Sequence, residues 1–243
     1  MRRQLAKLAV AAAERGLPDH ILRQGCRYLV RQRLKEEDGL STAERAALLR
    51  RWHAGPIALV PEAANEQHNE IPAEFFEIVL GSRLKYSSCL WEDATEDLDD
   101  AEEAMLALSV ARAGIQDDMR VLDLGCGWGS MSLYLAERFP GADIVAVSSS
   151  ESQGDFIRKR AAAKGLTNVV HTRADMNDLA IGGGFDAVVS IEAMEHVRNH
   201  PALLDRLAGL TTADASVFIH VFSHVEHWWE FEDRGPGDWI ARN

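Results

Sequence analysis

The sequence predicts an α/β fold in which a mostly parallel sheet is preceded by a small helical region. From residue 119 onward, short apolar runs alternate with segments of helical periodicity. This alternation is typical of parallel strands joined by helices. A glycine-rich turn at 125–129 directly follows the first apolar run, at the place where doubly wound sheets bind their ligands. We therefore expect a ligand site at the carboxyl end of the first strand.

Residues 1–82 are predicted to form a helical region and a hinge, and 83–243 the main domain. Apolar residues at helical spacing cover much of 1–52, with a break at Gly16–Asp19. The opening stretch, 1–14, is predicted to be an amphipathic helix rather than a targeting sequence, because its apolar run is short and interrupted by charge. The arginines of the next helix are interpreted as a solvated face.

Local signals mark the helices that come before the alternating region. Ser41 and Glu44 have the spacing of a capping box and indicate a helix start. Pro72 can open a short helix that Gly81 closes. An apolar stripe predicts a longer helix over Asp99–Ala113.

Five strands and three helices are expected in alternation after residue 119. Together they predict a mostly parallel sheet with helices on both faces. The expected strands are Arg120–Leu124, Ile144–Val147, Val169–His171, Phe185–Ile191 and Ser216–Phe222. The expected helices are Met131–Arg138, Glu151–Lys164 and Ala202–Leu210.

Charge and composition disfavour several classes of function. The formal net charge is −12, which disfavours nucleic acid and stable docking on an anionic membrane. No apolar run reaches the roughly 18 residues of a membrane-spanning helix. Cys26, Cys89 and Cys126 are odd in number and far apart, so neither a disulfide framework nor a metal site is predicted. We expect reduced thiols in a cytoplasmic protein.

The glycine turn indicates which ligand the site binds. Gly125, Gly127 and Gly129 have the spacing Gly-x-Gly-x-Gly, and Asp123 lies two residues before the first of them. Dinucleotide folds usually show Gly-x-Gly-x-x-Gly, where a pyrophosphate rests on the following helix. S-adenosylmethionine has no phosphate but carries a sulfonium and an ammonium, which an acid such as Asp123 suits. We therefore predict S-adenosylmethionine as the cofactor, bound by these four residues.

Two further loops at the same sheet edge offer polar groups to that cofactor. Ser148, Ser150 and Gln153 follow the second strand and can hydrogen-bond a ribose diol, although Ser150 can equally cap the next helix. Asp175 and Met176 follow the third strand. Asp175 can accept from the adenine amino group and Met176 can pack on the ring, but a solvated loop carboxylate is the competing interpretation.

Several segments together resemble the cyclopropane-fatty-acid synthase superfamily and, within it, the coclaurine N-methyltransferase branch. They occur in the same order and span most of the chain. They are Leu17–Asp19 with the arginine-rich helix after it, Ile71–Phe76, Leu84–Trp91, Asp123–Gly129, Ile191–Val197 and Asp238–Arg242. The resemblance implies a Rossmann-like methyltransferase fold.

The resemblance also implies roles for individual residues. Tyr86 and Ser87 would close over the methionine end of the cofactor, beside the glycine turn. Glu195 and His196 match the family's Glu-His pair at the reacting methyl group, and a helical segment here would put Glu192 one turn before His196, facing the same cavity. An amine acceptor must lose its proton before methylation, and a histidine beside a carboxylate suits that task.

Two positions bear on the choice of methyl acceptor. The lipid-modifying enzymes of the family carry Tyr-Ser-Cys, with the cysteine helping to hold a bicarbonate base. Here Ser88 occupies that position and Cys89 comes one residue later, which favours the amine branch. His220 matches a histidine that the lipid enzymes retain, which keeps the lipid interpretation open.

The sequence thus predicts a methyltransferase that N-methylates a small amine. The first alternative is a lipid enzyme that methylates or cyclopropanates an unsaturated acyl chain, and the second is a non-catalytic fragment that binds S-adenosylmethionine. The second rests on the family's continuation beyond the point where this chain ends, with two more strands. The sheet is therefore expected to be incomplete at its C-terminal end, with Ser216–Phe222 as an apolar edge that favours pairing with another molecule. Whether the chain forms a homodimer is left open.

Overall fold

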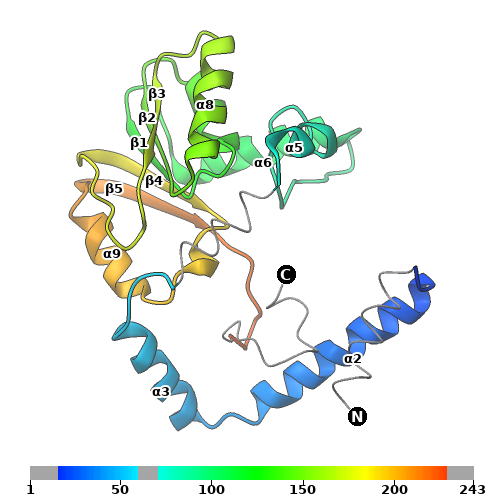
Figure 1. Cartoon of the computed structure of the whole chain (residues 1–243). Helices are drawn as coiled ribbons and strands as arrows, with labels where there is room; N and C mark the ends of the chain where they lie inside the picture. Colours follow the sequence, from blue (N-terminus) through cyan, green and yellow to red (C-terminus); the bar gives the residue numbers. More distant parts are fainter. Residues whose placement is uncertain (1–15, 60–70, 229–243) are drawn as a thin grey trace. The chain divides into compact units, whose positions relative to one another are not determined.

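The computed structural model describes residues 16–59 and 71–228 (Figure 1). Two compact units are present: residues 16–50 with 223–228, and residues 51–222 with the gap at 60–70. These divisions fall elsewhere than the boundary expected after residue 82, which stays a prediction. The helix expected at 1–14 lies outside the described residues.

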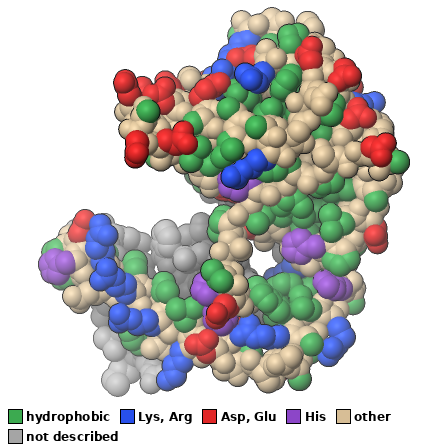
Figure 2. All heavy atoms as spheres, turned by 180° about the vertical axis from the view of Figure 1, so that it is seen from behind, with side chains coloured by type: hydrophobic (Ala, Val, Ile, Leu, Met, Phe, Trp, Pro, Cys, Tyr) green, Lys and Arg blue, Asp and Glu red, His purple; other side chains and the backbone are tan. Residues whose placement is uncertain are grey.

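The first unit contains helix α2, Asp19–Asp38, and most of α3, Thr42–His53. The capping box is confirmed: the Ser41 hydroxyl donates to Glu44 Oε2 at 2.6 Å, and Glu44 N–H donates back to Ser41 Oγ at 3.3 Å. Most arginines of α2 are exposed, as the solvated-face interpretation expected, and basic side chains follow the helix in Figure 2. Segment 223–228 is attached through His227, whose Nε2 lies 3.1 Å from Asp38 Oδ1.

The second unit is built on a five-stranded parallel sheet in the order β3-β2-β1-β4-β5. From β1 the chain first adds β2 and β3 on one side and then returns to add β4 and β5 on the other. The carboxyl ends of β1 and β4 therefore flank the point where the winding reverses, which is where such sheets form ligand crevices. The strands are β1 Arg120–Leu124, β2 Asp143–Ser148, β3 Val169–Arg173, β4 Phe185–Ile191 and β5 Thr211–His220.

The predicted strands are confirmed in number and order, but β2 and β3 extend one or two residues beyond their expected ends, and the bounds expected for the last strand were wrong. The last strand was expected at Ser216–Phe222, but it runs from Thr211 to His220. An irregularity in the pairing with β4, between Phe185 and Ala187, lets Thr211 pair opposite Phe185. Because β5 starts with the polar residues Thr-Thr-Ala-Asp, apolar runs in the sequence do not indicate that the strand begins this early.

Helices cover both faces of the sheet, as predicted (Figure 1). Alternate strand residues point to opposite faces. Val121 and Ile144 pack with α6 and α7, whereas Leu122 and Val145 pack with α9. The helices are α5 Ala73–Val79, α6 Leu98–Ala113, α7 Ser130–Arg138, α8 Glu151–Ala163, the short η1 Met194–His196, and α9 His200–Ala208.

Within the residues described, no helix has both the length and the apolar character needed to cross a bilayer.

Candidate functional site

Three glycines in the left-handed backbone region form the turn between β1 and α7. Their φ angles are 81° at Gly125, 52° at Gly127 and 83° at Gly129, which residues with a Cβ rarely adopt. A Cβ at Gly125 would overlap that of Ala193, and one at Gly129 would overlap Ile157. No described atom lies within 4 Å of a Cβ built at Gly127. The turn is therefore packed at both ends and accessible to a ligand in its middle.

Asp123 faces the protein interior rather than the open middle of the turn. Its side chain is buried, and Ser132 Oγ of α7 donates to Asp123 Oδ2 at 2.5 Å. Burial raises the pKa of Asp123 to about 6, although hydrogen bonds from Ser132 act in the opposite direction. These contacts join the end of β1 to the first turn of α7, and a direct contact of Asp123 with the cofactor stays a prediction.

Asp123→Asn should change how stability depends on pH. The carboxyl group has a folded-state pKa of about 6 against an ordinary 3.8, so it favours folding only while protonated. As pH rises through this window the unfolded chain ionises first, and the wild type should lose ~3 kcal/mol that the asparagine variant keeps. Urea unfolding of both proteins from about pH 4 to pH 7 measures this. Parallel pH profiles for the two proteins would contradict the burial argument.

The serines after β2 make contacts within the protein. Ser150 Oγ accepts from Gln153 N–H at 3.4 Å and caps α8, so the helix-cap interpretation is confirmed. Both Ser150 and Gln153 are buried. Ser148 Oγ lies 3.0 Å from Nε2 of His171 in β3. Hydrogen bonds from Ser148, Ser150 and Gln153 to a ribose stay predictions.

The loop after β3 lies beside the glycine turn. Met176 Cε lies 3.5 Å from a Cβ built at Gly125, so the structure brings these two predicted residues together. Asp175 is half-buried, and its Oδ1 accepts from Asn177 N–H at 2.7 Å. Asn177 in turn exchanges hydrogen bonds of 3.1 Å with the backbone of Ala58. Asp175 is therefore an ordered carboxylate rather than a fully solvated one.

Glu192, directly after β4, is the centre of a polar cluster. Its backbone has a φ of 51°, and its N–H donates to the His220 carbonyl of β5 at 2.7 Å. Its two carboxylate oxygens accept short hydrogen bonds from the hydroxyls of Ser87 and Ser88. Burial acts to raise the pKa of Glu192, but the hydrogen bonds from these hydroxyls, with the nearby Lys85 and His220, outweigh it and lower the pKa. Glu192 therefore stays ionised at neutral pH.

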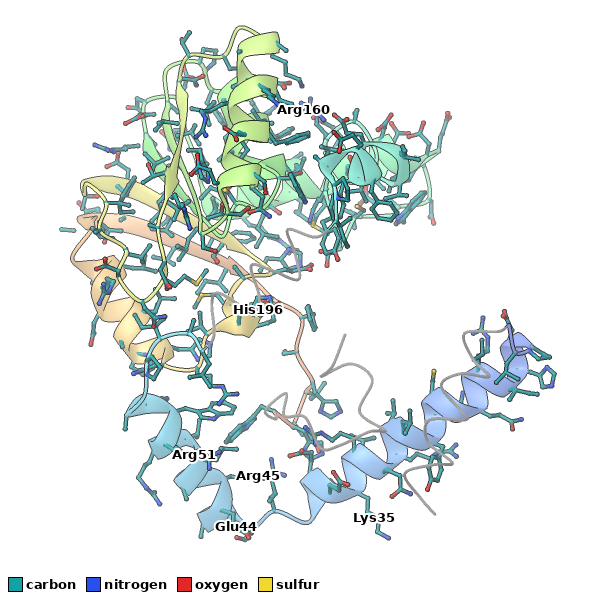
Figure 3. All side chains as sticks on the ribbon, in the orientation of Figure 1. Lys35, Glu44, Arg45, Arg51, Arg160 and His196 are labelled. Carbon is teal, nitrogen blue, oxygen red and sulfur yellow. The ribbon has the colours of Figure 1, made fainter. Side chains whose placement is uncertain are left out.

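Glu195 and His196 lie in the short helix η1 that follows Glu192. Glu195 Oε1 accepts from Phe222 N–H at 2.9 Å, beyond the end of β5. Its other oxygen, Oε2, is buried and has no hydrogen-bond partner among the described residues. His196 is exposed at the sheet edge where β4 ends (Figure 3). Glu195 thus has one carboxylate oxygen fixed by the backbone and one buried oxygen whose hydrogen-bonding capacity is unused within the described chain.

A row of aromatic rings runs past the glycine turn. Phe76 of α5 contacts both Tyr86 and Trp128, with ring centroids 5.6 and 5.3 Å apart. Trp128 also contacts Phe156 of α8 at 5.3 Å. Tyr86 itself is 65% exposed, so its ring has a free face to place over a ligand. Tyr86 was predicted from the sequence, but its aromatic neighbours were not, although Trp128 could have been suspected from its place inside the glycine motif.

Known proteins with similar sequences are methyltransferases or belong to a related enzyme family. The family model described as mycolic acid cyclopropane synthetase matches residues 60–243. An (S)-coclaurine N-methyltransferase of Thalictrum flavum subsp. glaucum is 34% identical over 185 residues, which are 76% of this chain and 51% of that protein. An (S)-coclaurine N-methyltransferase of Papaver somniferum is 31% identical over 93% of this chain and 65% of its own length. This chain therefore spans between half and two thirds of these curated relatives.

A solved structure agrees with the fold. The crystal structure of a coclaurine N-methyltransferase bound to N-methylheliamine and SAH superimposes with a TM-score of 0.85 at 30% sequence identity. The match covers 99% of this chain and 69% of that one. The predicted Rossmann-like methyltransferase fold is thereby confirmed.

Proposed function

We infer that this chain, which belongs to the mycolic acid cyclopropane synthetase family, transfers a methyl group from S-adenosylmethionine to the nitrogen of a small amine. One observation carries the proposal. Glu192 and Glu195 lie within four residues after β4, and Glu195 keeps a buried oxygen without a hydrogen-bond partner among the described residues. Two carboxylates beside a glycine turn suit a cationic acceptor that must lose a proton.

The residues around the turn fit the cofactor. The accessible backbone at Gly127, the side chain of Met176 and the exposed ring of Tyr86 would contact it, with Gly125 and Gly129 keeping the turn in shape. Ser87, Ser148, Ser150, Gln153 and Asp175 would add polar contacts, and Asp123 would support the turn from inside. When bound, S-adenosylmethionine supplies a methyl carbon that the adjacent sulfonium activates.

The proton of the amine would leave through η1. Glu195 Oε2 would accept it, since Oε1 is already held by Phe222 N–H and Oε2 has no partner among the described residues. His196, the next residue, is exposed and can pass the proton to water. Glu192 stays ionised and would attract the cationic amine before the proton leaves.

The lipid alternative remains a defined second candidate. It is favoured by the family description and by His220 at the end of β5, whose carbonyl accepts from Glu192 N–H. Against it, the Ser88 hydroxyl is bonded to Glu192 and occupies the position at which the lipid enzymes carry cysteine. No cluster of three or more metal-binding side chains occurs among the described residues, and no metal is part of the proposal.

The test combines cofactor binding with a choice of acceptors. Titration calorimetry with S-adenosylmethionine should show saturable binding, with NADH as the control that does not bind. Purified chain is then offered unsaturated phospholipid vesicles and, separately, a panel of secondary amines, with methyl-labelled cofactor. Label confined to amines supports the proposal, and label confined to lipid selects the second candidate. Cofactor binding without label on either acceptor would make this chain a non-catalytic binding fragment.

We also propose that the chain is cytoplasmic and that it associates with a second copy of itself. The parallel strand β5 is the sheet's edge in the described chain, and Val217 and Ile219 on it are 44% and 39% exposed. Such an edge favours pairing with a second copy. Sedimentation at several protein concentrations measures the oligomeric state.

A further inference from the structure

The segment between α5 and α6 has an unusual backbone that local sequence does not explain. Leu84 and Ser88 have φ angles of 51° and 56°, a left-handed conformation that is costly for residues with a Cβ. Residues 81–88 form no regular helix or strand. Yet this segment carries Tyr86, Ser87 and Ser88 to the site. Contacts from elsewhere must hold it in shape.

Glu102 of α6 supplies those contacts. Its side chain is completely buried, with 0% exposure. Oε1 accepts from Gly81 N–H at 2.9 Å and from Lys85 N–H at 3.1 Å, and Oε2 accepts from Arg83 N–H at 2.9 Å. A buried carboxylate is costly unless hydrogen-bonded. Burial raises the pKa of Glu102, and the three backbone N–H groups counteract this.

Lys85 connects the hydrogen bonds of Glu102 to the residues of the site. It is 4% exposed, and its Nζ donates to the Ser87 carbonyl at 2.7 Å. The next two hydroxyls, of Ser87 and Ser88, donate to the Glu192 carboxylate. A continuous chain of hydrogen bonds therefore runs from Glu102, through the backbone of 81–88, to Glu192 after β4.

We propose that Glu102 is a positioning residue for the methyl-transfer site: it fixes segment 81–88 so that Ser87 and Ser88 orient Glu192 and Tyr86 lies over the cofactor. The inference rests on the proposed function for its catalytic consequence, but the positioning itself is a property of the fold. Glu102 touches neither cofactor nor acceptor and acts only through the segment.

Glu102→Gln tests the proposal because it preserves shape. One amide oxygen can still accept from Gly81 and Lys85, while the amide NH₂ opposes Arg83 N–H, a donor against a donor. Displacement of site groups by about 1 Å can lower catalysis by up to about 100-fold, so we expect kcat/KM to fall by about 10- to 100-fold. The matched control is Glu103→Gln, the next residue, whose half-exposed carboxylate accepts from the Arg83 side chain rather than from the backbone of the segment and should leave kcat/KM within about 2-fold.

A second variant, in the segment itself, disturbs the contact between Gly81 and Glu102. A Cβ at Gly81 would lie 2.8 Å from Glu102 Oε2 and 2.5 Å from Oδ1 of Asp99, which accepts from Ser82 N–H of the same segment, at a backbone conformation that alanine can adopt. Gly81→Ala should therefore reproduce the kinetic effect of Glu102→Gln without altering the carboxylate. It keeps the proposal testable if Glu102→Gln does not fold.

Two readouts separate positioning from general destabilisation. In a double-mutant cycle, Glu102→Gln and the pair Ser87→Ala with Ser88→Ala should be non-additive in kcat/KM, because both disrupt the same chain of bonds. Hydrogen exchange should show lost protection in peptides covering 81–88, with β1 and β4 unchanged. Additive kinetic effects, wild-type kinetics for both Glu102→Gln and Gly81→Ala, or exchange that rises across the sheet as well would overturn the proposal.

Exchange and affinity for S-adenosylhomocysteine need no turnover. If the wild type methylates no acceptor, the proposed function fails, while selective exchange and weakened affinity in Glu102→Gln would still support the positioning role. If the wild type is active and Glu102→Gln changes neither quantity, only the positioning role fails.

Discussion

Glu195→Gln is expected to lower kcat by ~10²- to 10⁴-fold, the range that a positioned acid or base contributes. Glutamine has the size of glutamate, and its amide oxygen can keep the 2.9 Å bond from Phe222 N–H. The change falls on Oε2, the buried oxygen without a partner in the described chain, which becomes an NH₂ group that cannot accept a proton. Steady-state rates with saturating cofactor and acceptor measure the effect.

The control for this variant is Asp143→Asn. Asp143 is an exposed carboxylate at the start of β2, paired with Arg120 at 3.3 Å, and lies at the end of the strand away from the site. Its loss should leave kcat within about 2-fold, because exposed ion pairs contribute little. If Glu195→Gln retained most of the wild-type rate, the assignment of the proton acceptor to Glu195 would be wrong.

Gly125→Ala should have the largest effect on the glycine turn. The new methyl group would overlap the Cβ of Ala193, at a φ of 81°. Left-handed strain and overpacking together should lower the free energy of unfolding by ~2–5 kcal/mol. Because Ala193 directly precedes η1, the shift should also displace Glu195 and weaken cofactor binding. Denaturant unfolding and calorimetry measure the two consequences.

Gly127→Ala is the matched comparison within the same turn. Its φ is 52° and no described atom lies within 4 Å of the added Cβ. Only the strain of ~1–2 kcal/mol should appear in stability. Cofactor affinity should nevertheless fall, because the methyl group would occupy the open middle of the turn. Equal losses of stability in the two variants would contradict the packing described for Gly125.

The strands were predictable because their evidence is local. The buried runs of β1 and β4 are apolar, and the glycines that follow β1 have the left-handed conformation that the turn required. The bounds of an element were harder to predict where they depend on pairing with another part of the chain. The polar start of β5 forms a strand only because β4 lies beside it.

Site contacts were harder to predict for the same reason. Asp123 was expected to contact the cofactor because it precedes the turn, and this contact stays a prediction; its hydrogen bond from Ser132 in the first turn of α7 was not foreseen. Ser150 fits a cap and a ligand contact equally well in sequence, and only the structure identifies the cap. Glu102 gave no signal at all, since its partners are backbone N–H groups about 20 residues away.

In the proposed reaction, the two carboxylates after β4 prepare a small amine for methylation by S-adenosylmethionine. Transfer of a labelled methyl group to a panel of secondary amines, with wild type and Glu195→Gln compared at matched cofactor occupancy, tests this role. We expect labelled N-methyl product with the wild type and a rate reduced by ~10² or more in the variant. Labelled amine formed at equal rates by both proteins, or no labelled amine from a wild type saturated with cofactor, would contradict this role.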